Sequence, residues 1–507
     1  MFNIKNNNLT EILLLSIAEL KGDEKVVETL LKILRLENLT DREYKRLRRD
    51  LNNYLEELKD DLKIVAEAGY VDKVYRESYY DYFSTKNNEY SRYCLRLSFF
   101  KSDFDFDNDL FDEAKVADNY LGFLILRPMM QCLGRNVIDP AAKKAPKDKI
   151  KICSVEINAS CLGFKLKVKG FPHASQDSET MTCAQTTIWS LMEYFGNKYP
   201  EYRPVSPTEI ENILEPYLYK RLLPSGGLTT SQISVALRKF GFGSEIDYNN
   251  LRYPENFYER IACYIESGIP LALGMEDACS NLGHEIVCIG REDLSRESVV
   301  NYPFSIGSKL VFSWNKTVAH AKFVFNDDNL PCYQTAYLTH PTENYARLGY
   351  PGFQNFKITD IVVPLYRKVY MDAKIALDIS ETIIDKFLDF PDPIVVKTFL
   401  TSSRSYRNYI SAESGLDKIS KIAFLLIPLP KFIWITEISS VDQFKDHKIH
   451  SLIILDATGT EQSNMTKNII FLESFGTVYD YFTDIKNVKA GDKLLPDCFN
   501  SFKGNLN

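Results

Sequence analysis

Histidine is scarce in this 507-residue chain, and its cysteines form none of the familiar metal motifs. There are six histidines, and the ten cysteines include no C-x-x-C pair. This spacing excludes the common structural zinc sites, and nothing else in the sequence implies a metal or an organic cofactor. Scattered cysteines in a long chain without an export signal favour reduced thiols, so we expect a cytoplasmic protein.

Long apolar runs and a strong charge of either sign are missing as well. The apolar run ILLLSIA near the start is too short to cross a membrane, and it lacks the basic region and the cleavage site of a signal peptide. The formal net charge of −7 over this length gives no electrostatic basis for binding nucleic acid. We therefore expect neither a membrane nor a nucleic acid as a partner.

The composition is that of a folded protein with several domains. Hydrophobic residues make up 45% of the chain, which favours packed cores over disorder. A chain this long exceeds one core, so domains of about 100–200 residues are expected. The patterns predict a multidomain α+β fold with a helical N-terminal segment at 1–62, a β-rich domain at 63–170, a central domain at 171–370 and an α+β C-terminal domain at 371–507.

One N-terminal helix is predicted from both its cap and its periodicity. In LTDREYKRLRRDLNNYLEELKDDL, Thr40 and Glu43 form a T-x-x-E capping box. Apolar residues then recur at helical spacing, namely Leu47, Leu51, Tyr54, Leu55, Leu58 and Leu62. We interpret the segment as a helical hairpin packed on its neighbour. A dimerisation helix is the alternative, but the repeat is shorter than a sustained coiled coil.

Two arginines of the predicted β-rich domain, Arg127 and Arg135 in LRPMMQCLGRNVIDP, lie beside a proline and a glycine. They offer either a pocket for an anion or a peptide, or structural hydrogen bonds to carbonyl groups. We favour the structural interpretation because it is the commoner one for such pairs.

Cys183 is the first candidate for chemistry. It lies in SQDSETMTCAQTTIWSLMEYFG, at the start of a run with helical apolar spacing. The first turn of a helix stabilises a thiolate through the helix dipole and free backbone N–H groups. Gln176, upstream on a polar connection, can donate its amide to an oxyanion together with the Cys183 N–H. The alternative is that Cys183 is an ordinary cysteine.

His284 is the best candidate for the base. It opens the apolar strand HEIVCIG after a polar loop, and Gly283 before it lets the chain approach closely. An imidazole at this place can take the thiol proton and return it to the leaving group. The alternatives are a half-buried histidine at a strand end, and His320 as the base, although no glycine precedes His320.

The imidazole needs a carboxylate to orient it. The stretch HAKFVFNDDNLPCY runs from a predicted strand into Asn326, Asp327, Asp328 and Asn329. At the end of a strand next to that of His284, Asp327 or Asp328 can hold the imidazole N–H. Taken alone, the motif is typical of a solvated turn.

The order glutamine, cysteine, histidine, aspartate resembles that of papain-like cysteine peptidases. The segments CAQTTIWSLMEYFG, SGGLTTSQISVALRKFGF, ESGIPLAL and GHEIVCIG look most like the bacterial branch that cleaves double-glycine leader peptides, and like related uncharacterised bacterial proteins. The likeness covers about residues 171–335. It implies a central papain-like fold with Gln176 for the oxyanion, Cys183 as nucleophile, His284 as base and Asp327 or Asp328 as orienting acid.

The chain departs from that family in three ways. The C-G-x-C-W signature of the lysosomal relatives is absent, and the spacing from cysteine to histidine is shorter than theirs. Extra residues between His284 and the acidic pair include FSIGSKLVFSW, which we expect to form a β-hairpin and which could act as a flap over the cleft.

The resemblance implies a cytoplasmic thiol protease that hydrolyses a peptide or isopeptide bond of a protein or peptide substrate. One alternative is an acyltransferase or transglutaminase-like enzyme with the same triad, and another is an inactive protease fold that serves as a binding scaffold. The large flanks predict control by a regulatory protein partner, as a latent bacterial stress or antiphage defence enzyme would need.

Overall fold

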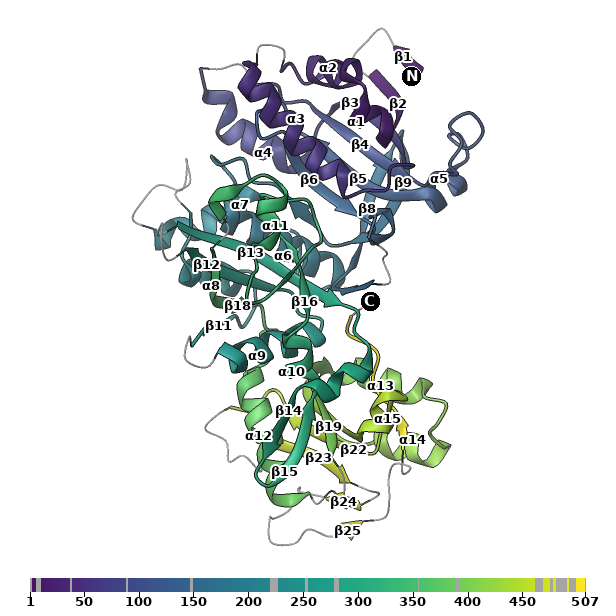
Figure 1. The fold of residues 1–507 in the computed structure, drawn as a ribbon, viewed down its shortest axis with the longest axis vertical. Coiled ribbons are helices and arrows are strands. Elements are labelled where there is room, and N and C mark those ends of the chain that lie inside the picture. Colours follow the sequence, from purple (N-terminus) through teal and green to yellow (C-terminus); the bar gives the residue numbers. More distant parts are fainter. Residues whose placement is uncertain are drawn as a thin grey trace.

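The computed structural model has three large β-sheets, which we call the upper, middle and lower sheets (Figure 1). It describes residues 2–506 apart from 6–10, 37–38, 88–89, 146–148, 219–226, 251–253, 278–281, 354, 389, 391–392, 461–467, 475–476, 480–489 and 492–497. The protein is a mixed α+β protein, as expected, with 37% helix and 31% strand. None of the described helices is both long and apolar enough to span a membrane.

The upper sheet is antiparallel and has seven strands in the order β1-β2-β3-β4-β5-β6-β10. Its strands are β1 (Phe2–Lys5), β2 (Glu11–Ser16), β3 (Lys63–Tyr70), β4 (Cys94–Phe100), β5 (Tyr120–Leu126), β6 (Leu133–Ile138) and β10 (His173–Ala174). Its helices are α1 (Ile17–Gly22), α2 (Glu24–Ile33), α3 (Asp41–Glu56), α4 (Lys73–Asp81) and α5 (Glu113–Asn119). Residues 1–62, expected to be helical, thus hold three helices and also two strands of this sheet.

Helix α3 begins where its sequence predicts. Thr40 and Glu43 form both hydrogen bonds of the capping box. The leucines at helical spacing are buried in one core with the strands of the upper sheet. Because this face is covered within the chain, the structure favours a packed helix over a dimerisation helix.

The middle sheet is antiparallel, with the order β11-β18-β12-β13-β16-β17 and with β7 paired to β13. Its strands are β7 (Ile150–Ile152), β11 (Glu245–Tyr248), β12 (Leu271–Asp277), β13 (Leu282–Glu292), β16 (Lys322–Asn326), β17 (Gln334–Tyr337) and β18 (Lys357–Val363). Its helices are α6 (Cys183–Lys198), α7 (Pro207–Leu214), α8 (Thr230–Lys239), α9 (Pro254–Glu266) and α11 (Glu343–Arg347). A separate hairpin, β8 (Val155–Cys161) with β9 (Phe164–Gly170), lies between this sheet and the upper one.

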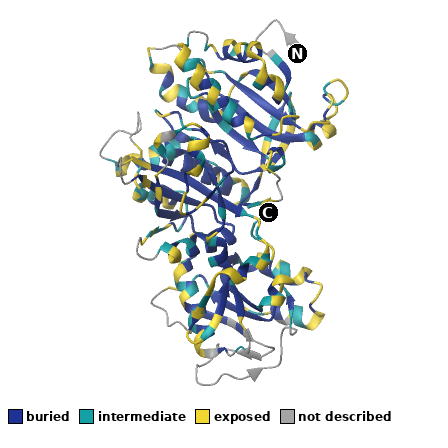
Figure 2. Ribbon diagram, viewed as in Figure 1, coloured by how far each residue is buried: buried dark blue, intermediate teal, exposed yellow. Residues whose placement is uncertain are grey.

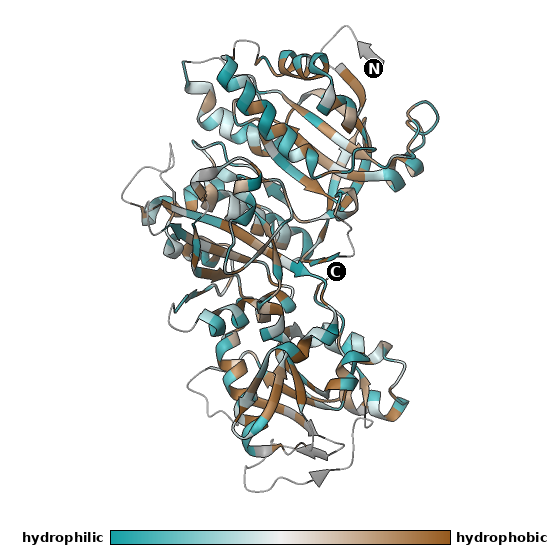
Figure 3. Ribbon diagram, viewed as in Figure 1, coloured by the Kyte–Doolittle hydropathy of each residue, from teal (hydrophilic) through white to brown (hydrophobic). Residues whose placement is uncertain are grey.

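Strand β13 separates two hydrophobic cores. Val287 and Ile289 belong to the core shared with the upper sheet, whereas Ile286 and Cys288 belong to the core shared with the lower sheet. This alternation follows from the two-residue period of a strand whose faces are both covered. Figure 2 shows the strands of the sheets as the most buried parts of the molecule, and Figure 3 shows that apolar residues concentrate there.

The lower sheet has the order β14-β15-β19-β20-β22-β23-β24-β25. Its strands are β14 (Pro303–Ile306), β15 (Lys309–Ser313), β19 (Ile394–Ser402), β20 (Phe432–Ser440), β22 (Ser451–Asp456), β23 (Ile469–Ser474), β24 (Thr477–Tyr479) and β25 (Ala490–Gly491). Its helices are α10 (Trp314–Ala319), α12 (Ala373–Phe387), α13 (Ser403–Ala412), α14 (Lys418–Leu425) and α15 (Val441–Lys445).

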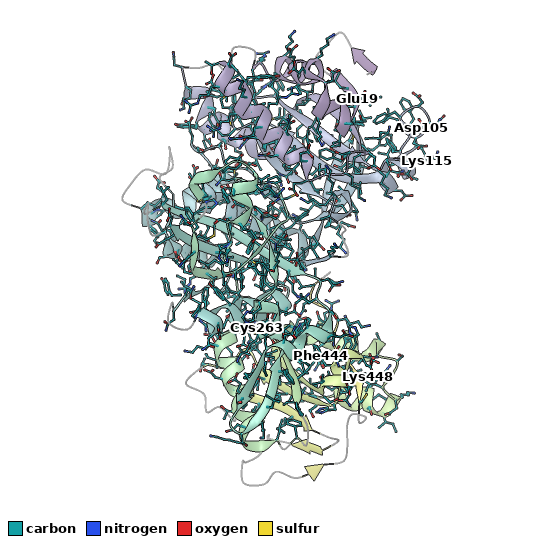
Figure 4. All side chains as sticks on the ribbon, viewed as in Figure 1. Glu19, Asp105, Lys115, Cys263, Phe444 and Lys448 are labelled. Carbon is teal, nitrogen blue, oxygen red and sulfur yellow. The ribbon has the colours of Figure 1, made fainter. Side chains whose placement is uncertain are left out.

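The stretch FSIGSKLVFSW forms the predicted hairpin, β14–β15, but the interpretation as a flap over the cleft is wrong. Strand β15 pairs in parallel with β19 and so extends the lower sheet. Trp314, which follows the hairpin, packs its ring 5.3 Å from that of Phe444 in α15 (Figure 4). Val311 and Phe312 of the hairpin are buried, and the pairing with β15 covers an edge of β19 that would otherwise be open.

Candidate active site

Cys183 is the first residue of α6. Thr182 precedes it as the N-cap, and the N–H and the hydroxyl of Thr182 donate to Gln185 Oε1 at 2.9 and 2.6 Å. Every residue from Ala184 to Phe195 is buried, whereas Cys183 is half-exposed. The helix is therefore fixed deep in the protein, while its first thiol stays partly accessible in the first turn, beside free backbone N–H groups.

Cys263 of α9 shows the contrast with a structural cysteine (Figure 4). It is fully buried, and burial together with nearby glutamates raises the pKa of its thiol well above the ordinary value. Such a thiol stays protonated and inert.

His284 lies near the start of β13, and its ring connects Cys183 to the acidic turn. It hydrogen-bonds the Cys183 side chain, and its Nε2 lies 3.0 Å from Asp327 Oδ1. Burial opposes the charged imidazolium, but the charge and hydrogen bond of Asp327 and the hydrogen bond of Cys183 outweigh it, so the pKa of His284 lies well above its usual value. The arrangement thus stabilises an imidazolium next to the thiol.

Asp327 is the carboxylate that holds the imidazole. It follows directly after β16, the neighbour of β13 in the sheet. Its Oδ1 accepts the Asn329 N–H at 3.0 Å, and its Oδ2 accepts the Tyr345 hydroxyl at 2.7 Å. Burial alone would raise the pKa of Asp327, but His284, Tyr345 and the Asn329 amide lower it below the ordinary value. Asp327 is therefore an ionised partner of His284.

Asp328 is also buried beside His284 but makes no direct bond to it. Its Oδ1 lies 3.8 Å from His284 Nε2, and neither carboxylate oxygen has a hydrogen-bond partner among the described residues. Burial first, and the charge of Asp327 second, raise the pKa of Asp328 to about 7. Of the two predicted acids, only Asp327 thus has the geometry to orient the base.

Gln176 joins the site through Asn329. Its Nε2 donates to Asn329 Oδ1, while its backbone carbonyl accepts from Arg127 Nη2 at 3.0 Å. The same Arg127 nitrogen donates to the carbonyls of Gln131 and Leu133. The interpretation of Arg127 as a donor to carbonyl groups is therefore confirmed.

Arg135 and His320, two other candidates from the sequence, have structural contacts. Arg135 pairs with Asp72 at 2.8 Å and is buried there. His320, the rival base, follows α10 and stacks on Tyr302 with the rings 4.1 Å apart. No described contact joins either of them to Cys183.

Three neighbours of the catalytic candidates were not predicted as site residues. Asn329 Nδ2 lies 3.4 Å from His284 Nε2, and the Tyr345 hydroxyl lies 3.2 Å from the same atom. The ring of Phe353 lies 5.7 Å from that of His284 and stacks on Tyr345. These side chains shield the bond between His284 and Asp327 from water, which strengthens it. Of these three residues, only Asn329 could have been recognised from the sequence, because it is the last residue of the acidic turn.

His173 of β10 contacts the backbone of Asp327. Its Nε2 lies 2.9 Å from the Asp327 carbonyl oxygen, and its Nδ1 lies 2.9 Å from Asn136 Nδ2. Burial lowers the pKa of His173 to about 4, so the ring is neutral at neutral pH. A histidine of the upper sheet thus fixes the backbone of the acidic turn.

His284, Asp327 and Asp328 could also serve as metal ligands. Their candidate ligand atoms all lie within 4.8 Å of one another. However, His284 Nε2 is already bonded to Asp327, so the contacts suit a proton-transfer group.

The arrangement can generate a thiolate, hold a protonated imidazole beside it and offer amide donors to an anion. Neither a protein-family model nor a curated protein matches this chain. The inference of function therefore depends on the geometry of these residues.

Proposed function

We propose that the protein is a papain-like cysteine protease of the cytoplasm that hydrolyses a peptide or isopeptide bond. The observation that carries the proposal is the chain of hydrogen bonds from Cys183 through His284 to the buried Asp327. The fold supports it, since the nucleophile opens a buried helix while the base and the acid come from two neighbouring strands of one sheet. A nucleophile, a base and an acid connected in this order form the catalytic triad that enzymes use for acyl transfer.

In the proposed reaction, the Cys183 thiolate attacks the carbonyl carbon of the scissile bond. The carbonyl oxygen becomes an oxyanion, which the Cys183 N–H and the remaining amide hydrogen of Gln176 stabilise. As the carbon–nitrogen bond breaks, His284 gives its proton to the leaving amine, and a thioester remains on Cys183. Water then attacks the thioester, His284 takes the proton from that water, and the acid product leaves.

The neighbours of the triad have positioning roles in this scheme. Asp327 bonds Nε2 of His284, so Nδ1 is the nitrogen that serves the thiol. Tyr345 and the Asn329 amide hold both oxygens of Asp327 in place. Asn329 accepts from Gln176 through its side chain and donates its backbone N–H to Asp327, so the oxyanion donor and the acid are oriented together.

Alkylation of the purified protein tests the proposal. With substoichiometric iodoacetamide near neutral pH, peptide mass spectrometry should find Cys183 modified far faster than Cys498, the other half-exposed cysteine of the described residues. In His284→Ala, Cys183 should lose this advantage because the imidazolium no longer stabilises the thiolate. Equal rates for the two cysteines in the wild type would overturn the proposal.

Hydrolysis and acyl transfer differ only in the acceptor, water or an amine. Mass spectrometry of the products distinguishes them, because transfer adds the mass of the amine to the cleaved fragment. A binding scaffold would instead keep its cellular role in Cys183→Ala, whereas an enzyme would lose it.

A further inference from the structure

A cavity of about 830 Å³ lies between α3 and the loop that leads to Cys183. Its first wall is the exposed face of α3 with Arg42, Lys45, Arg46 and Arg49. Its second wall includes Met129, Gln131 and the acidic residues Asp177 and Glu179. Figure 1 shows α3 crossing the upper sheet next to α4.

The four basic residues form a stripe along one side of α3. Their positions recur three, four and seven residues apart, which places them on the same helix face. Arg49 lies 3.0 Å from Asp50 and Arg46 lies 3.9 Å from it, so part of their charge is balanced. Arg42 and Lys45 make no ion pair with any described residue.

The acidic residues of the cavity are already engaged. Glu43 accepts the N–H and the hydroxyl of Thr40 in the capping box. Asp177 Oδ1 accepts three backbone N–H groups of its own loop, and Glu179 pairs with Lys86. Lys86 balances the charge of Glu179, and Arg127 lies 3.8 Å from Asp177, so the four basic residues of α3 leave the lining positive.

A single arginine joins the cavity to the catalytic candidates. Arg127 Nη2 donates to the carbonyl of Gln131, which lines the cavity, and to the carbonyl of Gln176, the oxyanion candidate. Asp177 in the cavity wall is the next residue after Gln176. The wall of the cavity is thus continuous with the loop that carries the oxyanion candidate.

We propose that this cavity binds an acidic stretch of the polypeptide substrate, with carboxylates facing Arg42 and Lys45. The proposal deepens the proposed function, on which it rests, by naming the substrate class. Tyr90 in the lining is partly exposed and can contact the apolar side chains between those carboxylates. The contiguity with Gln176, the candidate that faces the scissile bond, favours a peptide over a nucleic acid.

Binding to the full-length Cys183→Ala protein tests the cavity without requiring catalysis. A fluorescent peptide rich in Asp and Glu should bind about tenfold more tightly at low salt than its Asn and Gln counterpart, and 1 M salt should remove the difference. The double variant Arg42→Glu/Lys45→Glu should bind the acidic peptide about tenfold more weakly. Its matched control is Lys25→Glu/Lys165→Glu, which reverses two exposed charges outside the cavity and should bind like the parent.

Three results would overturn the proposal. The acidic and neutral peptides could bind alike, or the control variant could weaken binding as much as the cavity variant. A single-stranded oligonucleotide could also bind more tightly than the acidic peptide and depend on the same two residues, which would assign the cavity to nucleic acid. Failure of the proposed function would give a different result from failure of the proposed cavity site. Cys183 would then be alkylated slowly in the wild type, while the acidic peptide would still bind to Cys183→Ala.

Discussion

At the scale of single residues, the acidic turn assigns different states to two adjacent aspartates. Asp327 is bonded on both oxygens and ionised, whereas Asp328 has no hydrogen-bond partner among the described residues and a pKa raised to about 7. The difference arises because Asp327 meets hydrogen-bond donors, whereas burial and the charge of Asp327 outweigh the attraction of Asp328 to His284. Adjacent residues of the same type thus have different chemistry.

Asp327→Asn should slow the alkylation of Cys183 at pH 6 by roughly tenfold to a hundredfold. Without the carboxylate, the pKa of His284 falls, and fewer His284 rings carry the positive charge that promotes attack by the Cys183 sulfur. Asp328→Asn should slow the reaction much less, because the amide is uncharged like the protonated acid. The rate constants for the two variants against wild type give the measurement, and equal losses would contradict the assignment.

Asp328 should also make stability depend on pH. Its pKa rises from 3.8 when unfolded to about 7 when folded, so folding favours the protonated form. This contribution is complete below about pH 4 and is lost as pH rises through 7, by at most about 1.4 kcal/mol per pH unit. Urea unfolding at pH 4.5 and pH 8 should therefore show Asp328→Asn gaining stability relative to wild type at the higher pH. A constant difference between the two proteins would contradict this.

Most of the candidate triad could be predicted from the sequence because each member lies at the end of a strongly patterned element. Cys183 precedes a clear helical period, His284 follows a glycine before an apolar strand, and Asp327 ends one. The contacts that select Asp327 over Asp328 come from Tyr345 and Asn329, whose side chains meet the turn only in the folded chain. Tyr345 lies in the five-residue helix α11, which is too short to give a periodic signal.

At the scale of elements, two helices begin with the same capping box. Thr182 and Gln185 cap α6, and Thr229 and Gln232 cap α8. Only α6 carries the candidate nucleophile at its first residue. A comparison of cap variants in α6 and α8 therefore separates the effect of a cap on stability from its effect on the reactivity of Cys183.

Gln185→Ala and Gln232→Ala should each lower the free energy of unfolding by about 1 kcal/mol, since each variant leaves an N-cap without its reciprocal bond. Only Gln185→Ala should also slow the alkylation of Cys183, because it loosens the turn that positions the thiol. Urea unfolding and alkylation rates measure the two effects. If Gln232→Ala slowed alkylation equally, the effect would be one of general stability.

The sheets could be predicted less well than the helices. The hairpin β14–β15 follows from its local pattern, but its parallel pairing with β19 joins segments far apart in sequence. Strand β2 likewise pairs with β3, although helices α1, α2 and α3 separate the two strands in the sequence. The residues of a strand specify which side chains lie on each face of the sheet, but they do not specify which other strand it pairs with. Such pairings therefore cannot be predicted from the local sequence.

At the scale of the whole molecule, α3 links the upper body to the residues that cover His284, the candidate base. Asn53 Nδ2 donates to the Leu348 carbonyl at 2.9 Å, and the Tyr350 hydroxyl donates to Asp50 at 2.7 Å. These residues flank Tyr345 and Phe353, which contact His284. Deleting residues 1–62 would also remove strands of the upper sheet, so point variants are the better test of coupling.

Asn53→Ala/Tyr350→Phe should loosen the segment 343–353 while the sheets stay intact. Hydrogen exchange of its amides should rise severalfold, because both variants remove bonds that hold this segment to α3. If the flank restrains the enzyme, the alkylation rate of Cys183 should change as well. Tyr248→Phe, on an exposed residue of β11, is the control and should change neither. Unchanged exchange in the double variant would show that α3 does not hold the cover.

The passage of the chain through the lower sheet has a mechanical consequence. Residues 303–313 leave the middle body to add β14 and β15 to the lower one, and the chain then returns for β16. At the other end, Leu506 packs against the cores on both sides of β13. The middle and lower bodies are thus joined in two ways, by this passage of the chain and by the packing of Leu506. A single proteolytic cut between the two bodies would therefore not release either. A fragment that began at residue 371 would expose the bare edge of β19, so the lower body should not survive as an independent piece.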